Sequence, residues 1–319
     1  MFLAHGKPYF IKKVHTKKWA KSLQTGENMS HIEINNIHSQ IWMNGHMLPW
    51  DSAKLHILSH GLNNASCVFE GMRAYNGKIF RLEDHMQRFL NSANELGIEL
   101  PFSLEELVDA NKKLILSQNI KEGYIRPIAW LGNETLGISA IGASINVAIA
   151  AVPWPSNSLE DLRISGVSLG LSTWVKPAPN MTPYKAKAAC HYVLSRLSYE
   201  AAKRKSYDDA LLLDYRGYVA ESTGSNIFFV TDNALLTPIA DCFLNGITRQ
   251  TVIEIAKQNN MKVFEKHIHP NELFEFKESF LSGTAYEIMP VRKIGSIDLK
   301  VPGEITKIIQ EAYRAAVLS

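Results

Sequence analysis

The stretch Met181-Thr-Pro-Tyr-Lys-Ala-Lys-Ala-Ala-Cys-His-Tyr192 places two lysines, Lys185 and Lys187, between a proline-bearing turn and a helical pattern that starts near Ala188. Rigid elements can hold a lysine at such a junction and partly desolvate it, which frees the amine as a nucleophile. Such an amine forms Schiff bases with carbonyls, including the aldehyde of pyridoxal phosphate. Because most lysines are exposed, two solvated surface charges are the simpler interpretation of these residues taken alone.

Length and composition indicate an ordinary globular chain. A length of 319 residues predicts about two domains. The hydrophobic fraction of 46% and the charged fraction of 20% provide ample material for a core. The net charge of +3 is small, with the excess near the N-terminus, which argues against a nucleic-acid partner. No apolar run approaches the roughly 20 residues that cross a bilayer, so no membrane role is expected.

Cysteine usage and the N-terminal composition bear on location. The three cysteines are scattered, without metal-ligand spacing, so we expect neither a disulfide framework nor a metal site, and a reducing cytoplasm fits best. The first 28 residues contain six lysines and lack the apolar core of a signal peptide. We therefore predict that residues 1–38 form a basic and flexible N-terminal extension.

Turn signals and hydrophobic periodicity predict an α+β (α/β) chain with two domains. Two Asn-Gly pairs, at 44–45 and 76–77, separate short apolar runs and predict hairpins. Paired prolines near Trp154 mark the best linker. The expected helices cover 86–96, 104–115, 188–204, 248–259 and 304–317, and the expected strands cover 124–131, 145–152, 162–171, 210–214, 218–221, 227–230, 234–237 and 279–282. The predicted division is a small domain over 39–151, an interdomain loop over 152–164 and a larger domain over 165–319.

Two glycine-containing turns are candidate phosphate sites. In Asn245-Gly-Ile-Thr-Arg249 the glycine precedes a helix start, so the amides of Ile247 and Thr248 would face an anion. Ser282-Gly-Thr-Ala285 is a similar turn after a strand. Taken singly, an ordinary helix cap is the commoner meaning of such a turn, and Arg81 alone is more commonly a surface arginine.

Three further features have both a functional and a structural interpretation. Glu221 closes an apolar strand and suits a protonated pyridine nitrogen, but strand-end glutamates are usually exposed. Tyr124 and Arg126 lie two residues apart on one face of a strand, where they suit a substrate carboxylate or a cross-strand ion pair. Phe69 and Trp154 are either pocket walls or core.

Taken together, these segments resemble the class IV pyridoxal-phosphate aminotransferases, and most closely the branched-chain amino acid aminotransferases. The resemblance runs in order from about Ile41 to Ile297 and is specific because eight motifs occur in register. They are Ser66-Cys-Val-Phe-Glu-Gly71, Phe80-Arg81, His85-Met-Gln-Arg88, Tyr124-Ile-Arg-Pro127, Lys187-Ala-x-x-x-Tyr192, Glu221-Ser-Thr-Gly-x-Asn226, Gly246-Ile-Thr-Arg249 and Ser282-Gly-Thr-Ala285.

The resemblance implies the two-domain class IV fold (D-amino acid aminotransferase-like, fold type IV), pyridoxal 5'-phosphate as cofactor, and a homodimer or larger homo-oligomer. It makes Lys187, rather than Lys185, the residue joined to the cofactor. It also implies transfer of an amino group from branched-chain L-amino acids to 2-oxoglutarate. The implied cofactor contacts are Arg81, Lys187, Tyr192, Glu221, Ile247, Thr248 and Thr284. The implied substrate contacts are Phe69, Gly71, Tyr124, Arg126, Leu136, Ile138, Trp154 and Ala285, with Leu136 and Ile138 in a loop that enters the partner subunit's site.

Two positions depart from the family pattern. Asn64 and Asn157 stand where relatives usually have aromatic residues, which predicts a wider or more polar substrate pocket. Alternatives within the family are a D-amino acid aminotransferase and an aminodeoxychorismate lyase. From other classes, the alternatives are a Schiff-base lyase without cofactor and a non-catalytic binding protein.

Overall fold

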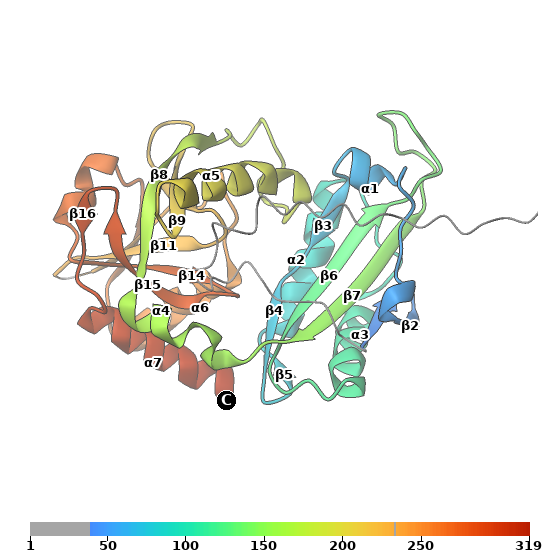
Figure 1. The fold of residues 1–319 in the computed structure, drawn as a ribbon, viewed down its shortest axis with the longest axis horizontal. Helices are drawn as coiled ribbons and strands as arrows, with labels where there is room; N and C mark the ends of the chain where they lie inside the picture. Colours follow the sequence, from blue (N-terminus) through green and yellow to red (C-terminus); the bar gives the residue numbers. More distant parts are fainter. Residues whose placement is uncertain (1–38, 233) are drawn as a thin grey trace, which may run out of the picture. The chain divides into compact units, whose positions relative to one another are not determined.

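Strands from the first half of the chain form a seven-stranded antiparallel sheet in the computed structural model, which describes residues 39–232 and 234–319 (Figure 1). The predicted extension over 1–38 lies outside the described residues. The strand order is β2-β1-β7-β6-β4-β5, with β3 paired to β6. The strands are β1 (Gln40–Met43), β2 (His46–Pro49), β3 (Cys67–Phe69), β4 (Met72–Tyr75), β5 (Lys78–Ile79), β6 (Gly123–Leu131) and β7 (Ile145–Pro153).

Both predicted hairpins are confirmed, and backbone geometry explains them. The β1–β2 turn has Asn44 at φ 48° and Gly45 at φ 90°, and the β4–β5 turn has Asn76 at φ 49° and Gly77 at φ 79°. Two successive positive φ angles match the twist of the flanking strands, and asparagine and glycine adopt them at the lowest cost.

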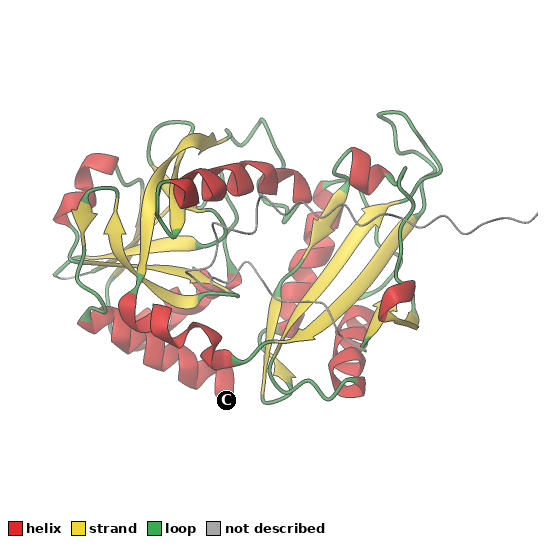
Figure 2. Ribbon diagram, viewed as in Figure 1, coloured by secondary structure: helices red, strands yellow, loops and turns green. Residues whose placement is uncertain are grey.

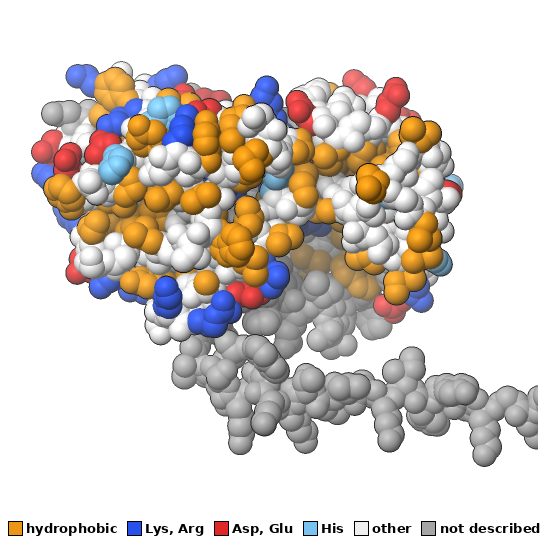
Figure 3. All heavy atoms as spheres, turned by 90° about the horizontal axis from the view of Figure 1, so that it is seen from above, with side chains coloured by type: hydrophobic (Ala, Val, Ile, Leu, Met, Phe, Trp, Pro, Cys, Tyr) orange, Lys and Arg blue, Asp and Glu red, His pale blue; other side chains and the backbone are white. Residues whose placement is uncertain are grey.

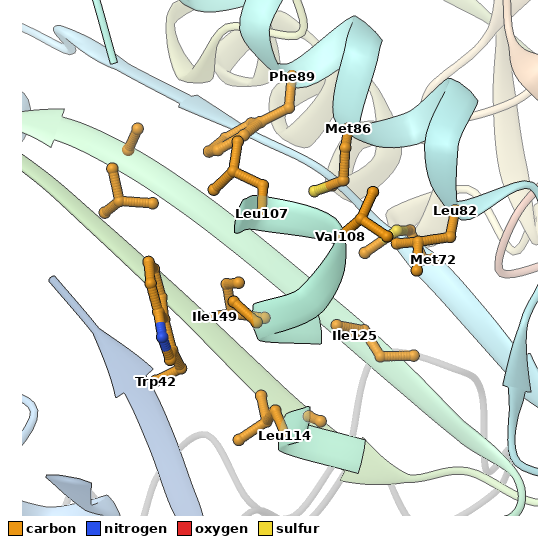
Figure 4. Packing of buried hydrophobic residues seen from close by; sticks show 14 of the residues in the cluster. Trp42, Met72, Leu82, Met86, Phe89, Leu107, Val108, Leu114, Ile125 and Ile149 are labelled. Carbon is orange, nitrogen blue, oxygen red and sulfur yellow. The ribbon is translucent and has the colours of Figure 1, made fainter. Parts of the chain in front are cut away.

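Helices α2 (Leu82–Glu95) and α3 (Leu104–Ser117) cover one face of this sheet. The predicted capping box at Ser103 is present, with its side chain accepting from the Glu106 amide and Glu106 accepting from the Ser103 amide. Alternate residues of the central strands point into the helices. This core includes Trp42, Met72, Met86, Phe89, Leu107, Ile125 and Ile149 (Figure 4). Because strand side chains alternate, Tyr124 and Arg126 lie on the opposite face from Ile125.

The second half of the chain forms a nine-stranded mixed sheet with helices around it (Figure 2). Its main order is β10-β9-β8-β15-β14-β11-β12-β13, with β8–β9, β8–β15 and β12–β13 parallel. The strands are β8 (Val167–Lys176), β9 (Asp209–Asp214), β10 (Val219–Ser222), β11 (Asn226–Val230), β12 (Leu235–Pro238), β13 (Val263–Lys266), β14 (Glu278–Gly283), β15 (Glu287–Ile294) and β16 (Ile297–Asp298). The α-helices outside α2 and α3 are α1 (His60–Asn63), α4 (Glu160–Ser165), α5 (Tyr192–Arg204), α6 (Ile247–Gln258) and α7 (Glu304–Leu318).

One predicted strand is wrong over its first part, and the sequence pattern did not reveal β13 and β15. The segment predicted as strand 162–171 begins with helix α4, and β8 starts only at Val167. Gly166, at φ 71°, ends the helix by donating to the Leu162 carbonyl. Strand β15 was missed because Pro290, Arg292 and Lys293 break its apolar pattern, and β13 was missed because it is short and half-exposed.

The predicted two-domain fold class agrees with these two sheets, whereas the exact limits of 39–151, 152–164 and 165–319 stay a prediction. Residues 39–232 and 234–319 belong to one compact unit. The segment 152–164 contains the end of β7, a 3₁₀ turn over Ser156–Leu159 and most of α4. Among the described residues, no helix combines the length and the apolar character needed to cross a bilayer.

Candidate active site

A cavity of about 190 Å³ brings together six of the residues predicted to contact a cofactor. They come from four separate parts of the chain, so only folding places them side by side. The six are Lys187, Tyr192, Glu221, Ile247, Thr248 and Thr284.

Lys187 is held at this cavity by its backbone and by a tyrosine. Its amide donates to Ser92 Oγ (2.9 Å), and its carbonyl accepts from the Phe69 amide (3.1 Å). Its Nζ donates to the Tyr192 hydroxyl at 2.7 Å. Lys185, in contrast, is exposed, with Nζ 6.0 Å from the ring centroid of Tyr184. The geometry therefore separates the two lysines that the sequence pattern left equivalent.

Glu221 is a buried carboxylate on the cavity wall, although glutamates at strand ends are usually exposed. One oxygen, Oε1, lies 2.6 Å from Lys176 Nζ, and Oε2 accepts from Asn226 Nδ2 at 3.1 Å. Burial lowers the pKa of Lys176, but the charge and hydrogen bond of Glu221 outweigh that effect and raise it. The Glu221 carboxylate is therefore held from two sides, by Lys176 and by Asn226.

The N-terminus of α6 provides an anion-binding end to the cavity. Gly246 is the N-cap and offers no side-chain cap, so the first amides of the helix, at Ile247 and Thr248, have no such acceptor. A side chain at residue 246 would bring Cβ within 2.4 Å of Asn226 Oδ1, which explains the glycine. Thr284 lines the same cavity. Amides at a helix start together with threonine hydroxyls suit a phosphate.

Arg81 is the one predicted cofactor contact outside this cavity lining. It has a left-handed backbone at φ 50°, directly before α2. Its Nε donates to Asp84 at 2.6 Å, and its Nη1 donates to Thr251 and Glu254, each at 3.1 Å. The phosphate role of Arg81 therefore stays a prediction.

The predicted substrate residues of the first half form a connected aromatic and cationic group. Arg126 Nη2 donates to the Tyr124 hydroxyl at 2.8 Å, and the Arg126 guanidinium lies 4.6 Å from the Phe69 ring centroid. Phe69 in turn packs on Tyr192 with centroids 4.7 Å apart, and Trp154 packs on Tyr124 at 5.4 Å. This group therefore extends from the amine of Lys187 to the guanidinium of Arg126.

Gly71 has a steric reason to be glycine. A Cβ at this residue would lie 2.1 Å from the Tyr124 hydroxyl oxygen. Any side chain here would displace the Tyr124–Arg126 pair, so the glycine keeps that hydroxyl in place.

The remaining predicted substrate residues lie elsewhere. Ala285 is half-buried beside Thr284, whereas Leu136 and Ile138 are 78% and 95% exposed. Hydrophobic side chains are visible over much of the face in Figure 3, and large apolar side chains are exposed at several described positions.

Asn64 is exposed. Asn157, which we expected to widen the substrate pocket, lines a different cavity.

Sequence reasoning gave no role to a buried ion cluster behind Lys187. Glu70, fully buried, accepts from Arg88 Nε (2.6 Å), Arg88 Nη2 (2.8 Å) and His85 Nδ1 (2.8 Å). Burial alone raises the pKa of Glu70, but Arg88 and His85 outweigh it and hold the pKa far below its usual range. Arg88 lines the cavity. The i, i+3 spacing of His85 and Arg88 on a helix was the available signal, since it places both on one face.

One group of side chains lies as close together as the ligands of a metal ion, but an arginine already pairs with its carboxylates. Asp214, Asp241 and Cys242 lie close enough to share an ion. Arg216 Nη2 lies 2.6 Å from Asp214 and 2.9 Å from Asp241. Burial and the two carboxylates raise the pKa of Cys242 to about 12, which keeps the thiol protonated. The cluster is therefore an ion-pair network around Arg216.

Known proteins match both the sequence and the fold. The family model for amino-transferase class IV matches residues 67–294. The probable branched-chain-amino-acid aminotransferase of Rickettsia felis is 45% identical over 271 residues, which cover 85% of this chain and 91% of that protein. The branched-chain-amino-acid aminotransferase of Escherichia coli K12 is 37% identical over 281 residues, which cover 86% of this chain and 91% of that protein.

Among solved structures, the T.th. branched-chain amino acid aminotransferase with pyridoxamine 5'-phosphate has a TM-score of 0.86 and 38% identity, and the match covers 88% of this chain and 95% of that one. The family resemblance and the fold class predicted from the motifs are confirmed. On this sequence match and this shared fold, the chain belongs to the class IV aminotransferases.

Proposed function

We propose that this protein is a pyridoxal-phosphate-dependent aminotransferase that moves the amino group of leucine, isoleucine or valine to 2-oxoglutarate. The observation that carries the proposal is the contact of Lys187 Nζ with the Tyr192 hydroxyl at 2.7 Å, in a cavity shared with Glu221 and the open start of α6. Relatives at 37–45% identity that bear the branched-chain name support the substrate class. None of the relatives reported above is a D-amino acid aminotransferase or a lyase, so these alternatives are not favoured.

The residues around the cavity fit the cofactor in charge and in donor type. The amides of Ile247 and Thr248 and the hydroxyl of Thr284 would hold the phosphate. Glu221, paired with Lys176, would accept from the ring nitrogen, and Tyr192 would donate to the phenolic oxygen. When bound, the cofactor supplies an aldehyde for the substrate amine and a ring that accepts the electrons of the bond broken at Cα.

Lys187 then acts as the general base and acid at the substrate. Its amine would carry the proton from the substrate Cα to the C4′ carbon of the cofactor, and it would carry a proton in the reverse direction in the second half of the cycle, when 2-oxoglutarate is the acceptor. Tyr192 keeps Nζ oriented through their hydrogen bond. The backbone bonds to Ser92 and Phe69 fix the lysine relative to the substrate wall. The two half-reactions make the overall scheme ping-pong.

Substrate contacts follow from the aromatic and cationic group. Tyr124 and Arg126 would bind a carboxylate of the substrate, since a guanidinium fork with a neighbouring hydroxyl suits that group. Phe69, Trp154 and Ala285 would surround the apolar side chain. The exposed apolar residues Leu136 and Ile138 would enter the site of a second subunit, which makes the enzyme at least a homodimer. We expect it to act in the cytoplasm.

Replacing Lys187 by alanine tests the catalytic assignment. We expect Lys187→Ala to lower kcat by at least the roughly 10²–10⁴-fold that general acid–base catalysis contributes. Lys185→Ala is the matched control, since Lys185 is exposed and two residues away, and it should keep kcat within about twofold. Borohydride reduction followed by peptide mapping should place the cofactor on Lys187. A label on Lys185, or near-normal turnover of Lys187→Ala, would disprove the assignment.

The amino-donor profile tests the substrate class separately. With 2-oxoglutarate as acceptor, L-leucine, L-isoleucine and L-valine should be used far better than their D-enantiomers. Preferential use of D-amino acids would replace the proposal with the D-specific member of the same family, without affecting the role of Lys187.

A further inference from the structure

The loop of residues 132–144 between β6 and β7 is closed at its base but has few contacts at its tip. A backbone hydrogen bond of 2.8 Å joins its first and last residues. Nearer the tip, Leu136 and Ile138 are 78% and 95% exposed, so packing does little to hold them. In the part of the chain that the structure describes, the tip over 135–141 makes a single hydrogen bond to a residue outside the loop, through the Ile138 carbonyl.

The donor of that bond is His60, a buried histidine of α1. Its Nε2 lies 3.2 Å from the Ile138 carbonyl oxygen, and its Nδ1 lies 2.8 Å from Ser66 Oγ. Because a carbonyl oxygen only accepts, Nε2 must carry a proton, and in the neutral ring Nδ1 then accepts from the Ser66 hydroxyl. His60 is only 5% exposed, so water does not readily replace either bond.

Backbone contacts fix His60 against the strand from which the loop starts. Its amide donates to the Gly132 carbonyl at 2.7 Å. The next residue, Gly61, lies so close to β6 that an added Cβ would be 2.6 Å from the Cβ of Trp130. The imidazole therefore has a fixed place relative to β6, and through Nε2 it also holds the tip of the loop.

The tip does not act on the candidate active site of its own chain, because neither Leu136 nor Ile138 lines that cavity. Exposed apolar side chains of this size are stabilised when a second protein surface covers them. A tip that is already held in place loses less conformational freedom when it closes over a ligand, so the binding is tighter. If the tip enters the site of a second subunit, the bond from His60 therefore favours substrate binding in that subunit.

We propose that His60 is a positioning residue that acts across the subunit interface, because it holds the loop tip that contacts the substrate of the partner. The inference rests on the proposed function, since it needs the second subunit and the loop contact described there. His60 touches neither the substrate nor Lys187. Loss of its bond to Ile138 should therefore raise KM for L-leucine and change kcat much less.

Substitutions at His60 test the bond itself. His60→Asn can still reach Ser66 but is too short to reach Ile138, so KM for L-leucine should rise about three- to tenfold, the range for one hydrogen bond. His60→Gln places an amide donor near the position of Nε2 and should keep KM within about twofold of the parent value. His46→Asn, at an exposed histidine, is the matched control and should behave like the parent. Parental KM in His60→Asn, or equal KM in His60→Asn and His60→Gln, would overturn the proposal.

Hybrid dimers test whether His60 acts across the interface. Chains with two different affinity tags are co-expressed, and the hybrid is isolated over both tags. In the first hybrid, one chain carries His60→Asn and the other carries Lys187→Ala. The one site with a lysine then receives its loop from a chain with His60 intact, so KM should equal that of the parent. In the second hybrid, one chain carries both substitutions, so the lysine site of the parent chain receives a loop without His60, and KM should rise about three- to tenfold.

The outcomes separate this inference from the proposed function. An impaired first hybrid with a normal second one, or equal KM in both, would overturn the inference and leave the proposed function intact. Failure of the parent to form a hybrid or to use leucine would overturn the proposed function and the inference with it. Hydrogen exchange over 135–141 gives a readout besides activity: it should be faster in His60→Asn holoenzyme, and unchanged exchange would overturn the role of the bond. If His60→Asn does not fold, His60→Leu, which has no donor, takes its place in each measurement.

Discussion

Two buried arginine–carboxylate clusters begin only three residues apart, at Glu70 and at Arg73, and they are satisfied to different degrees. Glu70 accepts from both nitrogens along one edge of Arg88 and from His85, so its cluster is closed. Arg73 and Arg163 both face Glu287, and four of their buried nitrogens make no hydrogen bond to the described residues, although Arg163 Nη2 lies 2.8 Å from the Glu287 carboxylate. Both clusters border a cavity, yet only the first lies behind the lysine of the candidate active site.

The difference separates two uses of a buried charge. A cluster whose hydrogen bonds are complete holds its neighbours in place, and Glu70 ties the segment that carries Phe69 and Gly71 to helix α2. A cluster whose buried donors lack hydrogen-bond partners stabilises the fold less, because each such donor has lost its water without gaining a partner. The comparison therefore predicts that the first cluster contributes more to the free energy of unfolding than the second.

Breaking the closed cluster should have the largest effect on stability. Glu70→Gln removes the carboxylate that pairs with Arg88 and leaves a buried cation, which costs about 3–5 kcal/mol. The loss is measured as the free energy of unfolding in urea at pH 7. The pKa of Glu70 is lower in the folded state than its unfolded value of 4.5. The stability that Glu70 contributes is therefore fully present above pH 4.5 and is lost as the pH falls through the folded pKa. A loss under about 1 kcal/mol would show that the cluster does not hold the fold.

A buried carboxylate with no arginine partner in its hydrogen bonds should show the opposite pH dependence. Asp209 is fully buried and accepts from Thr223 at 2.6 Å, and burial raises its pKa from 3.8 to about 6. Since the folded state binds the proton more tightly, the stability that Asp209 contributes falls as pH rises from 3.8 to 6, by about 3 kcal/mol. Asp209→Asn should therefore gain stability relative to the parent as pH rises through this window. Parallel stability curves for the two proteins would contradict this expectation.

The open cluster should lose less than the closed one when its carboxylate is replaced. Glu287→Gln keeps an acceptor for Tyr75, Arg163 keeps Glu160 at 3.4 Å, and the lost contact with Arg73 is long, at 3.7 Å, so we expect a loss of about 1–3 kcal/mol. Urea unfolding under the conditions used for Glu70→Gln gives the comparison directly. If Glu287→Gln cost as much as Glu70→Gln, Glu287 would stabilise its arginines as fully as Glu70 stabilises Arg88, and the two clusters would not differ in this respect.

The fold and the first cavity were predictable because their signals are local. Asn-Gly turns, the Ser103 capping box and the apolar stripe around Phe89 each act over a few residues, and the helix start at Gly246 belongs to the same class. The choice between Lys185 and Lys187 depended on the resemblance, because burial of one of them follows from contacts with Phe69 and Ser92 that are distant in sequence.

The missed features depend on packing across the chain. Lys176 pairs with Glu221 through strands that are not neighbours in sequence, and no periodicity reports such a contact. Asn157 was assigned to the substrate pocket because it departs from the family pattern three residues after Trp154, but the 3₁₀ turn that follows Pro155 brings it to a different cavity, which Glu160 and Arg163 also line. Short-range spacing does not determine on which side of a turn a side chain lies.

The smallest change in the free energy of unfolding is expected when an exposed ion pair is broken. This change is the reference against which the losses at the buried clusters are compared. Arg196 and Glu200 lie at i, i+4 on α5, with side chains 61% and 44% exposed and a contact of 2.7 Å. Water already solvates both charges, so Arg196→Gln should change the free energy of unfolding by no more than about 0.5 kcal/mol. The same urea experiment measures it, and added salt should reduce the change further because exposed charges are screened. A loss as large as that of Glu287→Gln would mean that burial is not what distinguishes these arginines, and the contrast between the closed and open clusters would then need another cause.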